Sequence, residues 1–205
     1  MAQKPVRSTT RRQTTTNAGK TGQIRIIGGI WRSRKLPVAE QPGLRPTTDR
    51  VKETLFNWLQ FELRDARVLD AFAGSGSLGF EALSRGASEL VMIEQTPHIA
   101  RQLQSNIDTL GVSANAQVIC ANALSAITPE LGTFQMVFLD PPFQQGLLQP
   151  CITQLEQAQC ISENGWVYIE CERDLPVTTP PHWQLHREKY AGQVAYRLYQ
   201  LRDKP

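Results

Sequence analysis

A glycine-rich stretch, residues 69–79, has the residue types and the spacing of a cofactor-binding loop. An apolar segment leads into Gly74, Gly76 and Gly79, which fit the pattern G-x-G-x-x-G. Glycines at this spacing form a tight turn, let a ligand approach the backbone, and let the next helix pack closely on its strand. We therefore expect this stretch to hold a nucleotide-like cofactor.

The acidic residue at the start of this stretch indicates the charge of the cofactor. A carboxylate at Asp70, at the end of a strand, would repel the pyrophosphate of a dinucleotide but attract a cation. S-adenosylmethionine carries an ammonium and a sulfonium group, so Asp70 favours this cofactor over NAD. The predicted contacts in the loop are Asp70, Phe72, Ala73, Gly74, Ser75 and Gly76.

Two polar residues that follow later strands extend the predicted cofactor site. Glu94 lies 20 residues after Gly74, a spacing at which an acid accepts hydrogen bonds from both ribose hydroxyls. That spacing also suits NAD. Asn122, with the backbone at Ala123, is predicted to contact the adenine edge, although an aspartate would be a stronger acceptor for an exocyclic amine.

The most informative group is the turn Asp140-Pro141-Pro142-Phe143. It could be a proline turn and nothing more. Two prolines remove backbone donors and fix φ, however, so the carbonyls and the Asp140 carboxylate would form a rigid array of acceptors. Such an array suits an amine whose lone pair faces a methyl donor, and Phe143 offers a face for an extruded base. We predict all four residues as catalytic.

A parallel sheet would bring these residues together. From residue 67 onward, predicted strands alternate with helices, which indicates an α/β, mostly parallel sheet of seven strands with helices on both faces. Ligands bind such sheets beyond the carboxyl ends of the strands. Strands are predicted over 67–72, 89–94, 116–121, 135–140 and 165–171, with a closing β-hairpin over 183–190 and 193–201. Helices are predicted over 77–85, 97–110, 123–127 and 147–159.

Charge divides the chain into a basic head and an acidic body. Residues 1–52 hold 12 Lys and Arg but two acids, for a net charge of +10, whereas the rest carries −7. A basic head indicates a polyanionic partner. We predict a disordered basic arm over 1–22, which could be only a solubilising tail, an N-terminal RNA-binding hairpin and helix over 23–62, and a catalytic domain over 63–205.

The basic head is predicted to contain a short hairpin. Residues 24–27 form its first strand, Gly28-Gly29 its turn and Ile30-Trp31 its return strand. No nearby carboxylate offsets the cations, and the indole could stack a base. The alternative is a structural edge hairpin with a half-buried Trp31. The residues predicted to bind RNA are Arg25, Trp31, Arg32, Arg34, Lys35, Arg45 and Arg50.

Other residue types give weaker signals. Cys120, Cys151, Cys160 and Cys171 form no C-x-x-C pair and are interpreted as reduced structural thiols, and no metal site is predicted. No apolar run reaches the length of a membrane span, and the start lacks a secretory signal, so we expect a cytoplasmic protein without membrane contact. The Arg-, Ser- and Thr-rich start leaves a mitochondrial transit peptide as the less favoured alternative.

Several of these segments resemble a known family. Residues 70–79, Glu94 and residues 140–143 resemble motifs I, II and IV of class I S-adenosylmethionine-dependent methyltransferases that act on amino nitrogens. Segments of the basic head resemble one family within this class more specifically. Together these segments resemble the ribosomal small-subunit methyltransferase D family from about Ile24 to Leu201. The segments that narrow the likeness are Arg25-Ile26-Ile27-Gly28-Gly29, Trp31-Arg32 and Leu44 to Trp58.

The resemblance implies a Rossmann-like class I methyltransferase that acts on 16S rRNA. Its product would be N2-methylguanine, made within an assembled or late-precursor small subunit by a monomer that uses S-adenosylmethionine. The resemblance also places Thr48 and Arg50, in the first turn of a helix, at the cofactor cleft, and many members of the general class have aspartate at the position of Asn122. The family's remaining positions carry over to Asp70, Gly74, Gly76, Glu94 and the turn Asp140 to Phe143.

The mechanism expected from these residues is direct in-line transfer to an amine aligned by Asp140 and the Pro141 carbonyl. Proximity and orientation can contribute as much as ~7 to 11 kcal/mol to such a step. A DNA adenine-N6 or cytosine-N4 methyltransferase is an alternative, although the chain has no separate target-recognition domain. A non-catalytic rRNA-binding assembly factor and an NAD-dependent enzyme are further alternatives, which the intact proline turn and Asp70 oppose.

Overall fold

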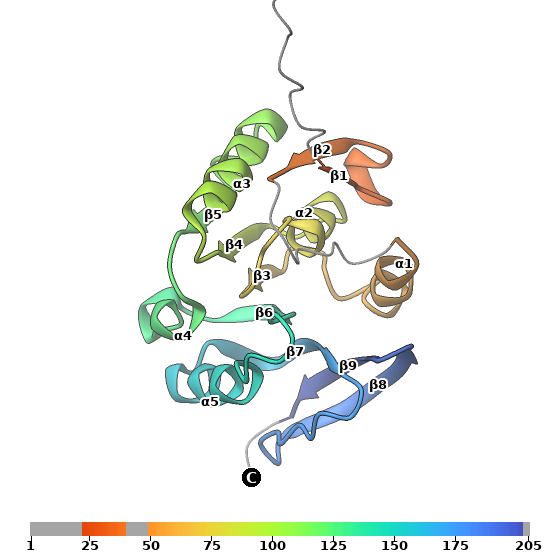
Figure 1. Cartoon of the computed structure of the whole chain (residues 1–205), viewed down its shortest axis with the longest axis vertical. Coiled ribbons are helices and arrows are strands. Elements are labelled where there is room, and N and C mark those ends of the chain that lie inside the picture. Colours follow the sequence, from red (N-terminus) through yellow and green to blue (C-terminus); the bar gives the residue numbers. More distant parts are fainter. Residues whose placement is uncertain (1–21, 40–48, 203–205) are drawn as a thin grey trace, which may run out of the picture.

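The computed structural model describes residues 22–39 and 49–202. Its centre is a seven-stranded sheet in the order β5-β4-β3-β6-β7-β9-β8 (Figure 1). Its first five strands along the chain, β3 to β7, are parallel. The predicted closing hairpin is formed by β8 and β9, and the structure adds that β9 pairs antiparallel with β7. The strands are β3 (Arg67–Asp70), β4 (Glu89–Ile93), β5 (Ala116–Ile119), β6 (Phe134–Leu139), β7 (Ile161–Glu172), β8 (Trp183–Ala191) and β9 (Val194–Leu201).

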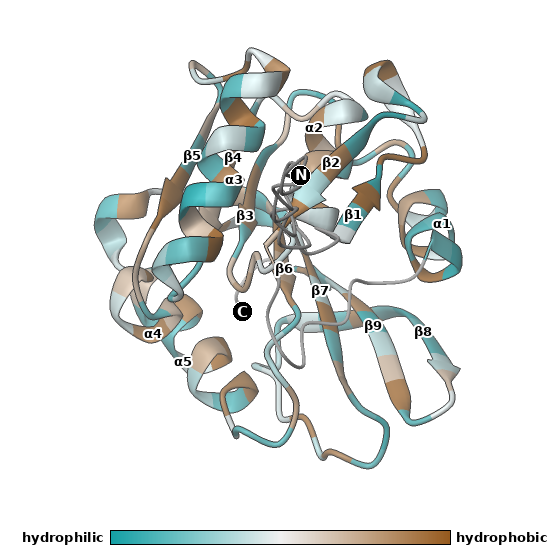
Figure 2. Cartoon of the chain, turned by 45° about the horizontal axis from the view of Figure 1, so that its top comes forward, coloured by the Kyte–Doolittle hydropathy of each residue, from teal (hydrophilic) through white to brown (hydrophobic). Residues whose placement is uncertain are grey.

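Helices cover both faces of this sheet because its buried strands are apolar on both sides. One face packs against α1 (Asp49–Trp58), α2 (Ser77–Ser84) and α3 (Pro97–Leu110). The other packs against α4 (Ala123–Ala126) and α5 (Leu148–Ala158). Hydrophobic residues follow the inner strands, while hydrophilic residues mark the outward surface of α3 (Figure 2). The predicted α/β fold with helices on both faces is therefore confirmed.

The basic head forms a separate two-stranded sheet of β1 (Gly22–Arg25) and β2 (Lys35–Val38). Its buried side chains, Ile24, Leu36 and Val38, and Ile26 just after β1 belong to the same apolar cluster as α2 and α3. The sheet lies beside α2 and α3 in Figure 1. The hairpin therefore packs onto the sheet domain through a shared core, although the predicted segment boundaries at 22/23 and 62/63 stay predictions.

The predicted return strand at Ile30-Trp31 is wrong. These residues lie in a 3-10 helix, η1 (Gly29–Trp31), and the chain returns only at β2. The cause is a contact with α2: the Ser84 hydroxyl accepts from the Trp31 amide at 3.0 Å and donates to the Gly28 carbonyl at 2.6 Å. Gly29 has φ +72°, and a Cβ there would lie 1.7 Å from the Ser84 carbonyl oxygen. Packing on a distant helix thus sets this turn.

Other boundaries differ by a few residues, and α5 begins at Leu148 rather than 147. The largest difference is at β7, which begins at Ile161 because this residue already pairs with Phe134 before an irregularity in the register. A second 3-10 helix, η2 (Pro129–Leu131), precedes β6. Across residues 22–39 and 49–202, no helix combines the length and apolar character needed to cross a bilayer.

The helix predicted after residue 48 is present as α1. Leu55 and, just after the helix, Leu59 are buried, and Val51 and Trp58 are half-buried. The structure adds Lys52, a buried residue whose side chain donates to the Arg25 carbonyl at 2.6 Å. This contact ties α1 to the N-terminal hairpin.

Candidate active site

A cavity of about 1220 Å³ lies beyond the carboxyl ends of the parallel strands. Its other walls include one side of α1, from Arg50 to Trp58, and the tip of the β8–β9 hairpin. The structure brings most of the predicted site residues into this cavity. They are Arg50, Asp70, Phe72, Ala73, Gly74, Ser75, Glu94, Asn122, Ala123, Asp140, Pro141, Pro142 and Phe143.

The glycine loop joins β3 to α2 and forms the floor of the cavity. Gly76 is not part of the cavity wall; it begins α2 with φ +75°, and a Cβ there would lie 2.5 Å from the Phe80 ring. The amide of Gly79 donates to Asp70 Oδ2 at 3.1 Å. Gly76 and Gly79 therefore serve the close packing of α2 on the sheet, while Gly74 and Ser75 face the cavity.

Asp70 is a buried carboxylate, 1% exposed, in the wall of the cavity. Burial raises the pKa of Asp70 to about 7, against the opposing effect of the Gly79 and Phe72 amides, and the nearby Glu94 carboxylate adds to the rise. Its Oδ1 atom makes no hydrogen bond of ordinary geometry with any described residue, and neither does Ser77 Oγ. A buried acceptor of this kind fits the cationic amino-acid part of S-adenosylmethionine.

Glu94 follows β4 and braces the loops around the cavity. Its Oε2 atom accepts from the Gly74 amide at 3.1 Å, and its Oε1 atom accepts from the Thr96 amide at 2.7 Å. Asn122 follows β5, where its Oδ1 atom caps α4 by accepting from the Leu124 amide at 2.9 Å. Each side chain lies at the cavity as predicted from its strand end, and their contacts to ribose and adenine stay predictions.

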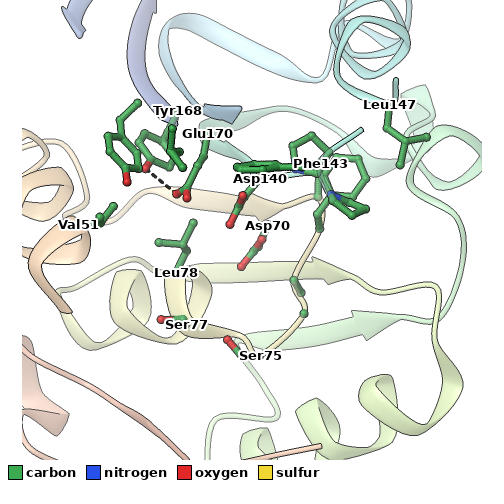
Figure 3. A pocket seen from close by; sticks show the side chains of 18 of the residues that line it. Val51, Asp70, Ser75, Ser77, Leu78, Asp140, Phe143, Leu147, Tyr168 and Glu170 are labelled. Atoms are coloured by element: carbon green, nitrogen blue, oxygen red, sulfur yellow. Dashed lines mark hydrogen bonds between the residues drawn. The ribbon is translucent and has the colours of Figure 1, made fainter. Parts of the chain in front are cut away.

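The proline turn follows β6 and faces the glycine loop across the cavity. In Figure 3 the carboxylates of Asp140 and Asp70 point into the same space. Pro141 is buried, whereas the Phe143 ring is 39% exposed at the rim. The backbone N–H of Gln144 donates to the Glu172 carboxylate on β7, and this hydrogen bond anchors the end of the turn. Neither proline has an N–H group, so the turn offers acceptors to whatever lies in the cavity.

Sequence reasoning missed two groups of cavity residues. Tyr168 and Glu170 reach the cavity from β7, and Lys189 and Tyr190 reach it from the hairpin tip. The first group had a signal: Trp166, Tyr168 and Glu170 alternate along a predicted strand, and the acid falls at its carboxyl end. The hairpin tip had none, because only the antiparallel pairing of β8 and β9 brings it over the cavity.

The basic residues of the head do not share one environment. Arg25 pairs with Asp49 at 2.7 Å, so the expectation that no carboxylate lies near the cations is wrong for Arg25. Arg34 donates to the Thr109 carbonyl of α3 at 3.0 Å. Arg32 and Lys35 are exposed on the hairpin, as is Arg50 at the cavity.

The indole of Trp31 is partly buried against the core, which favours its structural interpretation. Arg45 and Thr48, predicted for RNA and cofactor contacts, lie outside the described residues, as does the arm apart from Gly22. The RNA contacts of the described cations stay predictions.

No cysteine or histidine is among the described residues that line the cavity. All four cysteines are free thiols, and burial raises the pKa of Cys151 to about 12. His182 Nε2 lies 3.2 Å from Glu156 Oε1, and the His186 ring packs edge-on against Trp166. Among the described residues, no cluster of His, Cys, Asp and Glu side chains has the makings of a metal site.

Comparisons with known proteins agree with this geometry. The family model described as "Conserved hypothetical protein 95" matches residues 24–200. The ribosomal RNA small subunit methyltransferase D of Escherichia coli is 53% identical over 186 residues, which cover 90% of this chain and 93% of the relative. Its counterpart in Haemophilus influenzae is 48% identical over 182 residues, covering 87% and 94%.

A solved structure is similar as well. The putative methyltransferase yhhF of Escherichia coli has a TM-score of 0.82 at 52% identity, covering 89% of this chain and all of that one. The family match over residues 24–200 runs through the hairpin, the glycine loop and the proline turn. The chain therefore belongs to the ribosomal RNA small subunit methyltransferase D family.

Proposed function

We propose that this chain transfers a methyl group from S-adenosylmethionine to the exocyclic N2 amine of a guanine in small-subunit rRNA. The acceptor turn at Asp140 carries the proposal. It lies in one cavity with the glycine loop, and it offers hydrogen-bond acceptors and an aromatic ring but no backbone donor at either proline. An amine on a flipped base is the kind of substrate that such a surface binds.

The cofactor part of the proposal depends on Asp70 and its neighbours. When bound, S-adenosylmethionine would supply a methyl group on a positively charged sulfur. Asp70 and Glu94 would hold its polar groups, and the unpartnered Oδ1 atom of Asp70 is the observation that fits a cation. NAD fits less well because a buried carboxylate there would repel its pyrophosphate.

The residues of the turn would do the chemistry by positioning. The Asp140 carboxylate and the Pro141 carbonyl would accept hydrogen bonds from the amine and so direct its lone pair across the cavity, while the Phe143 ring would stack on the base. The amine loses a proton after methylation, to Asp140 or to water, and no covalent intermediate with the protein is needed. Positioning of this kind can supply as much as ~7 to 11 kcal/mol.

The substrate proposal comes from family membership and from the basic head. The relatives are named for small-subunit rRNA, and the exposed cations Arg32, Lys35 and Arg50 suit a phosphate backbone. We further propose that the protein acts in the cytoplasm on an assembled or late-precursor small subunit. Action as a monomer and without a metal stays a prediction from the sequence.

Labelled S-adenosylmethionine tests the proposal directly. Wild-type protein is incubated with small subunits from cells that lack the enzyme, or with duplex DNA, and the labelled nucleoside is identified by mass spectrometry. We expect N2-methylguanosine from the subunits. Asp140→Ala should lower the rate by roughly 100-fold or more, the scale of one positioned polar group in an active site, while cofactor binding measured by calorimetry persists.

The matched control is Asp174→Ala, which removes an exposed carboxylate that is not part of the cavity wall and should leave the rate unchanged. A labelled adenine or cytosine, label only in DNA, or near wild-type turnover by Asp140→Ala would contradict the proposed reaction.

A further inference from the structure

A second carboxylate lies beside Asp140 at the cavity. Leu139 of β6 pairs with Ile169 of β7 in parallel register, so the next residues lie side by side: Asp140 just past the end of β6, and Glu170 two residues before the end of β7. Both line the cavity, and Glu170 is only 9% exposed. The cavity wall thus holds a buried acid, Glu170, next to a half-buried one, Asp140.

The position of Glu170 is fixed by aromatic neighbours. The Tyr168 hydroxyl donates to Glu170 Oε2 at 3.1 Å, as Figure 3 shows. Burial, together with the charges of Glu170 and Asp140, raises the pKa of Tyr168 well above its ordinary value, so its hydroxyl remains a donor. Tyr196 of β9 pairs directly with Glu170 across the sheet and also lines the cavity. The carboxylate is thus held in one orientation.

A pair of adjacent carboxylates matches the edge of one base in particular. Guanine presents its N2 amine next to the N1–H group, which places two donors side by side. Adenine and cytosine present their amines next to a ring nitrogen that carries a lone pair and would be repelled by a carboxylate. Since a carboxylate has about four acceptor positions, the bond from Tyr168 leaves Glu170 able to accept another hydrogen bond.

We propose that Glu170 is a specificity-determining residue that accepts a hydrogen bond from guanine N1–H while Asp140 holds the N2 amine. This inference rests on the proposed function, because it concerns the base in the same cavity. It assigns the choice of guanine to β7 and the alignment of the amine to the proline turn.

The test compares two bases that both carry the N2 amine. Small subunits are assembled on rRNA that has either guanine or 2-aminopurine at the methylated position; 2-aminopurine has an unprotonated N1. Methylation of both is measured for wild-type protein and for Glu170→Gln, whose amide can donate to an unprotonated N1 as well as accept from N1–H.

We expect wild-type protein to prefer guanine in kcat/KM, and Glu170→Gln to reduce that preference by about 10- to 150-fold, the worth of one hydrogen bond to a charged group. Tyr168→Phe, which keeps the carboxylate but removes its donor, should reduce the preference by a smaller factor. Glu163→Gln, an exposed acid on the same strand and outside the cavity wall, is the matched control and should leave the preference unchanged.

The outcomes separate this inference from the proposed function. If wild-type protein does not methylate guanine N2, the proposed function fails. If it does, but Glu170→Gln slows both bases equally, the specificity role is refuted. Weakened cofactor binding by Glu170→Gln in calorimetry, with an unchanged preference, would assign Glu170 to the cofactor and also overturn the inference. If Glu170→Gln does not fold, an unchanged preference in Tyr168→Phe refutes it instead.

Discussion

Replacing Asp70 by asparagine keeps the shape of a buried side chain and removes its charge. In the folded protein, burial raises the pKa of this group from 3.8 to about 7. Each pKa unit corresponds to about 1.4 kcal/mol, so the charged carboxylate lowers the free energy of unfolding by about 4 kcal/mol once it is fully ionised. Asp70→Asn should therefore stabilise the protein above pH 7.

The sign of the pH dependence follows from which state binds the proton more tightly. The folded state does, because its pKa is the higher one, so the cost of Asp70 is absent below about pH 4 and grows as pH rises to about 7. Above that pH it is constant. The difference in free energy of unfolding between Asp70→Asn and wild-type protein should rise over this window and then level off.

Urea unfolding of both proteins at several pH values between about 4 and 8 measures this difference. The matched control is Asp65→Asn, an exposed acid with φ +59°, a conformation that asparagine tolerates. It should show no such rise. A difference between Asp70→Asn and wild type that stays flat across the window would refute the raised pKa of Asp70.

Ionisation of Asp70 costs stability as pH rises, but it should strengthen cofactor binding, because a cationic ligand binds the ionised carboxylate. In calorimetry, the affinity of wild-type protein for S-adenosylmethionine should increase by up to about tenfold per pH unit over the one to two units below pH 7 and then level off. Asp70→Asn should bind more weakly, by about 1.5 to 3 kcal/mol, and without the increase. An affinity that is independent of pH in wild-type protein, or the same slope in the variant, would remove Asp70 from the cofactor site.

Two other substitutions test the basic head and its attachment to the sheet. Glu81→Gln should lower the free energy of unfolding, measured in urea, by about 1.5 to 3 kcal/mol. The buried Glu81 carboxylate accepts from both the Ile27 backbone amide and the Arg85 side chain, and the single oxygen of a glutamine side chain can accept from only one of them. An unchanged midpoint would show that the two contacts add no stability. Arg50→Ala should weaken binding to small subunits and reduce the salt slope by about one. Arg101→Ala, an exposed arginine on α3 that is not part of the cavity wall, is its control, and equal losses in both variants would argue against a defined RNA path at the cavity.

The alternation of strands and helices could be predicted because it depends on local patterns. Apolar runs that end in Asp70, Glu94 and Asp140 identify strands, and the carboxyl ends of parallel strands meet at one edge of a sheet. For that reason the predicted site residues at the strand ends lie in one cavity although they are up to 73 positions apart, as Asp70 and Phe143 are. The glycine loop and the proline turn could also be predicted to belong to this site, because their unusual backbone chemistry is visible in the residue types alone.

Contacts between distant segments could not be predicted in this way. The turn at Ile30-Trp31 depends on Ser84, and the charge of Arg25 is offset by Asp49 across 24 positions. No periodicity along the chain records such pairs, because each depends on how one element packs on another.

The sequence by itself determined the alternating strands and helices, the glycine loop and the acceptor turn, since each of these depends on residues close together in the chain. Tertiary structure alone decided which groups share the cavity with them. The register of β6 against β7 places Glu170 beside Asp140, and the β8–β9 hairpin brings Lys189 over the cavity. The physical reason is that hydrogen-bonded register and burial are properties of pairs of strands, so the donors and acceptors that meet a base are set only when the sheet forms.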